Sequence, residues 1–181
     1  HEVFKEYKAT REKQPDELYE QIPLIKEVAK DFGFHIEEVA GYEADDVIGT
    51  LARKASKHDL KTVIVTGDMD ALQLVDENTV VYTIKRGIND TITYDVAAVR
   101  EKHGFGPGKV IEYKALAGDS SDNIPGVAGV GEKTAKELLA DFDSIDEIYE
   151  HLEKGGKKIK ETVAKKLLAS KDNAFLSRNL A

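Results

Sequence analysis

The chain has 181 residues, no cysteine and a net charge of −8, which fits one domain with at most a small appended lobe and excludes a disulfide scaffold. It has no apolar run near the roughly 18 residues of a membrane span and no signal-peptide pattern, so we expect a cytoplasmic protein without a membrane partner. Residues 1–13 carry four Lys or Arg against three acids, residues 14–150 carry 14 against 28, and residues 151–181 carry eight against three. This division suits cations bound at the centre and phosphates at the periphery, although a solvated Lys-rich terminal helix is the simpler explanation of charge alone.

The first part of the chain predicts mainly helix. Residues 1–11 are typical of one or two basic helical turns, and apolar residues at helical spacing predict a helix from Asp16 to a stop at Gly33. A short strand or sheet edge is expected over residues 34–39. The segment GYEADD, residues 41–46, then precedes a helical pattern that runs through Ala55, which places acids at or just before a helix N-terminus.

The middle of the chain predicts a small α/β sheet. The β-branched run TVIVT, residues 62–66, is typical of a strand buried on both faces of a parallel sheet. A helix is expected next, from beyond Gly67 through Leu74. Two strands follow over residues 79–84 and 91–94, joined by an irregular turn at Gly87, Asn89 and Asp90. The last elements expected in this part are a helix capped by Asp95 that runs through His103 and a helix over residues 110–116.

The last third predicts short helices separated by glycine turns. After Pro125 and the glycines that follow it, the helices expected there cover residues 132–139, 144–152 and 159–170.

Acidic residues gather in three short clusters, each beside a glycine and at the end of a predicted element. Carboxylates this close repel one another unless a positive charge lies between them. Acids in a first helical turn are also explained by the helix dipole, which they complement by about 0.3–1 kcal/mol each. The clusters contain Glu43, Asp45 and Asp46; Asp68 and Asp70; and Asp119 and Asp122.

Together the clusters predict a metal site. None contains His or Cys, which argues against zinc and favours the hard ions Mg²⁺ or Mn²⁺. Asp68 and Asp70 follow a predicted strand at its carboxyl end, where open α/β sheets bind ligands. Two such ions roughly 4 Å apart would serve the hydrolysis of a phosphodiester.

The segment GVAGVGEKT, residues 126–134, predicts a second site. Its last glycine opens a helix whose free N–H groups form an anion site, with Lys133 and Lys136 close by. This pattern indicates a grip on a DNA backbone that is independent of sequence. A plain helix-turn-helix with glycine as a helix cap explains the same residues.

Three segments resemble a known family: GYEADD, TGDMDALQLV (residues 66–75) and GDSSDNIPGVAGVGEKTAKELL (residues 118–139). They resemble the 5′ nuclease (5′-3′ exonuclease) domain of bacterial DNA polymerase I, within the flap endonuclease superfamily, and the resemblance covers essentially the whole chain. It implies a PIN-like α/β fold with a mainly parallel central sheet flanked by helices, plus a C-terminal helical subdomain of helix-hairpin-helix type.

The resemblance also implies roles for individual residues. It makes the seven clustered acids metal ligands, directly or through water, for two Mg²⁺ or Mn²⁺ ions, and it makes Asp68 and Asp70 catalytic. Its arch segment corresponds to YKATR, residues 7–11, in which Lys8 and Arg11 contact phosphates as catalytic groups and Tyr7 stacks on a base. Without the resemblance, Tyr7 is an ordinary amphipathic contact and the two cations are merely solvated.

The DNA-binding residues that the resemblance implies lie in the hairpin of residues 126–131 and the helix after it. A monovalent cation such as K⁺ is expected at the hairpin carbonyls. The residues implied are Gly126, Gly129, Gly131, Lys133, Thr134 and Lys136.

Two departures from the family pattern leave the ligand set intact: Met69 stands where a Lys is common, and Ala71 where a larger apolar residue is usual. A third is more serious, because the family's domain begins with strands that carry two further acids, and nothing before His1 supplies them. We therefore expect residues 1–117 to form an α/β nuclease core that lacks its N-terminal strands, with an arch over residues 1–15. Residues 118–181 are expected to form the DNA-binding subdomain.

The expected function is divalent-metal-dependent hydrolysis of DNA in replication and repair. The expected partner is branched or 5′-flapped duplex bound without sequence specificity, and a polymerase domain is expected to follow in the parent protein. The alternative is a DNA-structure-binding module with weak or no catalysis. A metal-binding scaffold with no nucleic-acid role is the third hypothesis.

Overall fold

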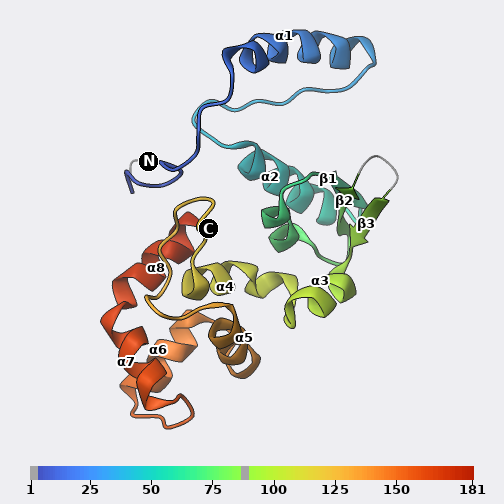
Figure 1. The fold of residues 1–181 in the computed structure, drawn as a ribbon. Coiled ribbons are helices and arrows are strands. Elements are labelled where there is room, and N and C mark those ends of the chain that lie inside the picture. The colour runs from blue at the N-terminus through green and yellow to red at the C-terminus, as the bar shows by residue number, and fades with distance from the viewer. Residues whose placement is uncertain (1–3, 87–89) are drawn as a thin grey trace.

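The computed structural model describes residues 4–86 and 90–181, and Figure 1 shows its course from the N-terminus to the C-terminus. A small α/β unit is followed by a cluster of helices, which confirms the predicted α/β class with a helical C-terminal part. Within the described residues, none of the helices has both the length and the apolar character that crossing a bilayer requires.

The sheet has three strands in the order β1 (Thr62–Val65), β2 (Thr79–Arg86) and β3 (Asp90–Tyr94). β1 and β2 run parallel, with Ile64 beside Val81, and β2 and β3 run antiparallel, with Val81 beside Tyr94. The predicted pairing of the hairpin strands is confirmed. Its predicted turn at Gly87 and Asn89 lies outside the described residues.

Only one face of the sheet is covered by other described elements. Helices α2 (Ala44–Ser56) and α3 (Val96–His103) and the 3-10 helix η1 (Met69–Leu74) contribute to a core around Ile64, Leu72 and Val81. On β1, Val63 and Val65 are 60% and 71% exposed. The prediction that residues 62–66 are buried on both faces is therefore wrong for this structure, because β1 is an edge strand whose second face meets no described helix.

The segment before α2 differs most from expectation. Residues 5–10 form successive turns rather than a helix, because the left-handed Lys8 (φ +58°) interrupts the right-handed path. Helix α1 (Asp16–Asp31) is confirmed, but none of its residues is buried, and Figure 1 shows it standing apart from the other elements. The strand predicted over residues 34–39 is wrong, because these residues are extended but pair with no strand.

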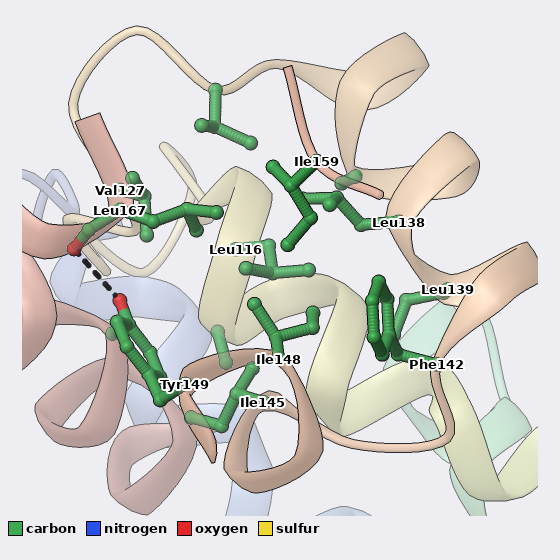
Figure 2. Packing of buried hydrophobic residues seen from close by; sticks show 14 of the residues in the cluster. Leu116, Val127, Leu138, Leu139, Phe142, Ile145, Ile148, Tyr149, Ile159 and Leu167 are labelled. Carbon is green, nitrogen blue, oxygen red and sulfur yellow. Dashed lines mark hydrogen bonds between the residues drawn. The ribbon is translucent and has the colours of Figure 1, made fainter. Parts of the chain in front are cut away.

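The C-terminal helices enclose a second core. After the 3-10 helix η2 (Pro107–Lys109), five helices contribute residues to it: α4 (Val110–Ala117), α5 (Glu132–Asp141), α6 (Ile145–Glu153), α7 (Glu161–Ala169) and α8 (Lys171–Leu180). Figure 2 shows Leu116, Ile148 and Leu167 packed together there, and the Tyr149 hydroxyl donates a hydrogen bond of 3.0 Å to the Leu167 carbonyl. Full burial of each such side chain stabilises the fold by about 1.5–3 kcal/mol.

Helix α8 was not predicted from the sequence. Ser170 is both the C-cap of α7 and the N-cap of α8, so no loop separates the two helices. The sequence therefore predicted one helix up to residue 170 and no element after it. In the structure α8 packs along α4, and Ala174 and Ser177 are fully buried. This packing brings the C-terminal helix against the chain segment that carries the third acid cluster.

Candidate active site

A cleft of about 1240 Å³ lies between the N-terminal segment, α2, η1 and the end of α8. Residues from all three acid clusters line it, together with both predicted cations of the arch segment. The predicted site residues in its wall are Tyr7, Lys8, Arg11, Glu43, Asp45, Asp46, Asp68, Asp70 and Asp122. Tertiary structure therefore joins segments that are far apart in sequence, such as Arg11 and Asp122, which are separated by 111 positions.

Asp68 and Asp70 lie just beyond the carboxyl end of β1, as predicted. The Asp68 amide donates to Thr66 Oγ1 at 3.0 Å, and the Asp68 side chain accepts from the Asp70 amide at 2.9 Å. Asp68 is thus the N-cap of η1. The backbone leaves the strand at this point and places both carboxylates on the cleft.

Glu43, Asp45 and Asp46 lie at the start of α2. Glu43 and Asp46 form a reciprocal capping box, in which the Glu43 amide donates to Asp46 Oδ2 at 3.0 Å. Asp45 makes the electrostatic link to the next cluster: burial first, and then the negative charges of Asp68 and Asp70, raise its pKa. Glu43 and Asp46 thus have a structural role at the start of the helix. Asp45 is repelled by the carboxylates of the neighbouring cluster, and a bound cation would relieve this repulsion.

The third cluster is folded into a tight loop after α4. Asp119 and Ile124 pair through their backbones in both directions, at 2.9 and 2.7 Å. Gly118 and Gly126 pack backbone against backbone, since a Cβ on Gly126 would lie 2.3 Å from the Gly118 nitrogen. The acid loop and the glycine segment after it therefore form one rigid unit.

Lys114 connects the second and third clusters and is absent from the predicted site. Its ammonium pairs with Asp70 and lies 2.7 Å from Asp119 Oδ2, with the residue only 8% exposed. Burial alone would lower the pKa of Lys114, but the two carboxylates raise it. One feature of the sequence could have indicated this role: Lys114 lies inside the mainly apolar helix VIEYKALA. A buried ammonium needs carboxylate partners, because an unpaired buried charge is costly.

The same contact holds Asp119 ionised. Burial alone would raise the pKa of Asp119, but Lys114 and the Ser121 hydroxyl lower it to about 2. The Ser121 amide also donates to Asp119 Oδ1 at 2.9 Å. Asp119 is thus a carboxylate at any physiological pH.

The arch cations pair with acids of the cleft. Lys8 pairs with Glu43, and Arg11 lies 2.5 Å from Oδ1 of the buried Asp122. The Lys8 amide also donates to the Asp122 carbonyl at 2.9 Å, and the Lys8 ammonium lies 4.7 Å from the centre of the Tyr7 ring. The segment predicted to contact the scissile phosphate therefore lies directly over the predicted metal ligands.

The acids share one region but do not converge on a point. Within residues 4–86 and 90–181, no three His, Cys, Asp or Glu side chains are arranged to hold a metal ion. Lys8, Arg11 and Lys114 instead form ion pairs with four of the seven predicted ligands, and Lys114 is shared by two of them. The donor set is nevertheless all carboxylate oxygen, which fits a hard divalent cation.

The glycine segment forms a tight turn before α5. Gly126 and Gly129 have φ of +63° and +76°, and the Val130 amide donates to the Val127 carbonyl at 2.9 Å. Gly131 is the N-cap of α5 and has an ordinary extended backbone. Lys133, Thr134 and Lys136 follow in the first turns of α5, where Lys136 pairs with Glu132 at 2.7 Å.

Comparison with known proteins identifies the family of this chain. Residues 1–104 match the family model "5'-3' exonuclease, N-terminal resolvase-like domain", and residues 105–181 match "5'-3' exonuclease, C-terminal SAM fold". The chain is 48% identical to DNA polymerase I of Caldicellulosiruptor bescii over 180 residues, or 98% of this chain and 21% of that one. It spans about a fifth of the length of the curated relatives that it matches.

Solved structures show the same fold. T5 5'-exonuclease with bound divalent zinc ions matches 99% of this chain and 67% of its own at 25% identity, with a TM-score of 0.77. The bacteriophage T5 D15 flap endonuclease in a complex with DNA and metal ions matches 99% and 66% at 24% identity, with a TM-score of 0.76. The chain, from its arch segment to its last helix, belongs to the 5'-3' exonuclease family, with a resolvase-like N-terminal part and a SAM-fold C-terminal part.

Proposed function

We propose that this chain is the 5′ nuclease part of a DNA polymerase I and that it hydrolyses phosphodiesters of branched or 5′-flapped DNA with Mg²⁺ or Mn²⁺. The observation that carries the proposal is the cleft in which three acid clusters face the two arch cations. Family membership and the metal-bound and DNA-bound T5 structures support it. In this proposal the protein acts in the bacterial cytoplasm during replication and repair.

The residues that would hold the metals are the acids around the cleft. Divalent ions, when bound, supply activation of water and stabilisation of the leaving oxygen in phosphodiester hydrolysis. Asp45 has the least compensated charge of its cluster, because burial and then nearby carboxylates raise its pKa, and we assign it with Asp68 to the most negative part of the site, next to Asp70 and its partner Lys114. The remaining proposed ligands are Glu43, Asp46, Asp119 and Asp122.

The chain's own cations orient the substrate in this proposal. Lys8 and Arg11 project from the segment that crosses the cleft, so a phosphate between them and the acids would exchange their present carboxylate partners for phosphate oxygens. Tyr7, beside Lys8, would stack on a neighbouring base. These groups position the scissile phosphate and offset its negative charge.

We assign duplex binding to the glycine segment, residues 126–131, with Lys133, Thr134 and Lys136. Backbone amides and phosphate contacts carry no base information, so binding is independent of sequence. A K⁺ ion at the other carbonyls of the segment, besides that of Gly129 to which Lys166 donates, belongs to the same proposal. Residues 1–117 would then be the nuclease core and residues 118–181 the DNA-binding subdomain.

Cleavage of a labelled 5′-flap duplex by the 181-residue chain tests this function. We expect flap release with Mg²⁺, and its loss in Asp68→Asn and in Asp70→Asn. Asp143→Asn is the matched control, because the Asp143 side chain is 90% exposed, lies outside the cleft and, among the described residues, pairs with Lys109 alone. Cleavage that survives both cleft substitutions would contradict the proposal.

The alternative is a DNA-binding module without catalysis, favoured by one observation. Four proposed ligands already pair with three internal cations, so part of the negative charge at the cleft is offset without metal. This alternative predicts binding to flapped duplex that weakens with salt, and no cleavage at any metal concentration.

A further inference from the structure

The glycine segment, residues 126–131, has a buried side and an exposed side. Val127 and Val130 are 2% and 4% exposed and pack in the second core, whereas Ala128, Gly129 and Gly131 are exposed. Packing of these two valines does not provide hydrogen-bond partners for the backbone N–H and C=O groups of the turn, which need them. Two side chains from the last two helices supply them.

The first partner is Ser177 of α8. Its side chain is fully buried, and its Oγ accepts a hydrogen bond of 2.9 Å from the Gly126 amide. Gly126 is also the residue whose backbone packs on Gly118, directly before Asp119. Ser177 therefore holds the start of the glycine segment at its junction with the acid loop.

The second partner is Lys166 of α7. Its Nζ donates a hydrogen bond of 2.8 Å to the Gly129 carbonyl. Its stem lies against the same residue, since a Cβ on Gly129 would be 3.0 Å from Lys166 Nζ. The ammonium thus turns the Gly129 carbonyl toward the protein at the exposed tip of the segment.

We infer that Ser177 and Lys166 are positioning residues that hold the glycine segment in the shape that receives DNA phosphates. A carbonyl at the tip that points outward would repel a phosphate, whereas a carbonyl bound by Lys166 leaves neighbouring amides to face it. Lys166 acts through the loop and need not contact DNA itself. This inference rests on the proposed assignment of duplex binding to residues 126–131.

The chain offers a matched control for Lys166. Lys165 is its neighbour on α7 and carries the same charge, and within the part of the chain that the structure describes its ammonium pairs with Glu161 of its own helix alone, at 2.7 Å. Lys166→Met and Lys165→Met therefore remove the same charge from adjacent positions, but only the first removes a contact to the glycine segment. Affinity for a 5′-flap duplex is measured by fluorescence anisotropy with EDTA present, so that no cleavage occurs, across a salt series.

We expect Lys166→Met to weaken binding by about fivefold to tenfold at each salt concentration, which corresponds to about 1 to 1.4 kcal/mol, because the glycine segment loses a hydrogen bond from a charged donor. We expect Lys165→Met to stay within about twofold, and the salt slope of Lys166→Met to match that of Lys165→Met. A drop of about 0.9 in the slope for Lys166→Met alone would overturn the inference, because it would mark a direct phosphate contact. Equal losses of affinity in the two variants would overturn it as well.

Ser177→Ala gives a second, independent readout. It removes the acceptor of the Gly126 amide without adding volume, so we expect faster hydrogen exchange at Gly126 and weaker DNA binding at a temperature where the chain stays folded. Unchanged affinity of the folded variant would reduce Ser177 to a stabilising role and overturn its part of the inference. Failure of the unsubstituted chain to bind any duplex would instead overturn the proposed function, and the inference with it.

Discussion

The Lys114 ammonium lies 2.7 Å from Asp119 Oδ2 inside the protein, and the same ammonium pairs with Asp70 from a different cluster. One buried cation thus joins the carboxyl end of β1 to the loop after α4. It occupies the kind of position, between carboxylates, that the sequence assigns to a metal ion. The protein can therefore keep its acid clusters together before any metal binds.

Replacement of Lys114 by Met should destabilise the fold, because it leaves two acids without their cation. We expect a loss of about 2–4 kcal/mol in the free energy of unfolding in EDTA, near the range for breaking a buried pair. Millimolar Mg²⁺ or Mn²⁺ should recover part of this loss by taking over the charge. Urea denaturation with and without metal measures both, and an equal loss in the two conditions would contradict a shared role.

Lowering the pH should reduce the stability of the folded protein through protonation of Asp119. Its pKa in the folded protein is about 2, below the ordinary value near 3.9 of the unfolded chain. The depressed pKa contributes about 2 kcal/mol of stability that is fully present above about pH 4 and is lost as the pH falls toward 2. Urea titrations of the unsubstituted chain and of Asp119→Asn over this range should show that the variant lacks this part of the pH dependence. Parallel curves would contradict it.

Two glycines of one segment should differ strongly in how much stability their substitution by Ala costs. Gly126→Ala forces a left-handed φ on Ala and drives its Cβ into the Gly118 backbone, so we expect a loss of more than about 3 kcal/mol. Gly131→Ala meets no atom within 4 Å and has an ordinary φ, so it should cost about 1 kcal/mol or less as a poorer N-cap. Thermal unfolding compares the two, and similar losses would contradict the backbone contact.

Lys8→Met tests whether Lys8 acts on the substrate phosphate or on metal binding. Lys8 pairs with Glu43, so its removal should leave metal affinity equal or higher, since a competing cation is gone. Flap cleavage should fall about 100-fold or more, by loss of a charge aimed at the phosphate. Calorimetry with Mn²⁺ and a cleavage assay at saturating metal report the two effects. Reduced metal affinity would show instead that Lys8 organises the ligands.

Local patterns predicted most of the elements because each rested on residues close in the sequence. The helix after Asp95, the hairpin strands and α5 follow from capping, alternation and helical period, and the structure contains them. The wrong strand over residues 34–39 followed from an apolar pattern that no neighbouring strand completes. Helix α8 was missed because Ser170 ends one helix and starts the next without a turn signal.

The site shows the same division between local and long-range information. Clustering and element ends indicated the acids of the cleft, but not their distances, which depend on how α4 packs against η1. Lys114 and Ser177 escaped prediction because each sits in an ordinary helical pattern, and only tertiary packing brings Lys114 to Asp119 and Ser177 to Gly126. Long-range polar contacts of buried residues leave no periodic trace in a sequence.

A shared metal site is tested most directly by titration of the 181-residue chain with Mn²⁺, in which the electron spin resonance signal of free Mn²⁺ measures how much of the ion is bound. We predict saturable binding that Mg²⁺ displaces, that Asp68→Asn combined with Asp70→Asn abolishes, and that Asp143→Asn leaves unchanged. Absence of saturable binding at millimolar Mn²⁺, or equal binding by the doubly substituted chain, would contradict the assignment of the three acid clusters to one metal site.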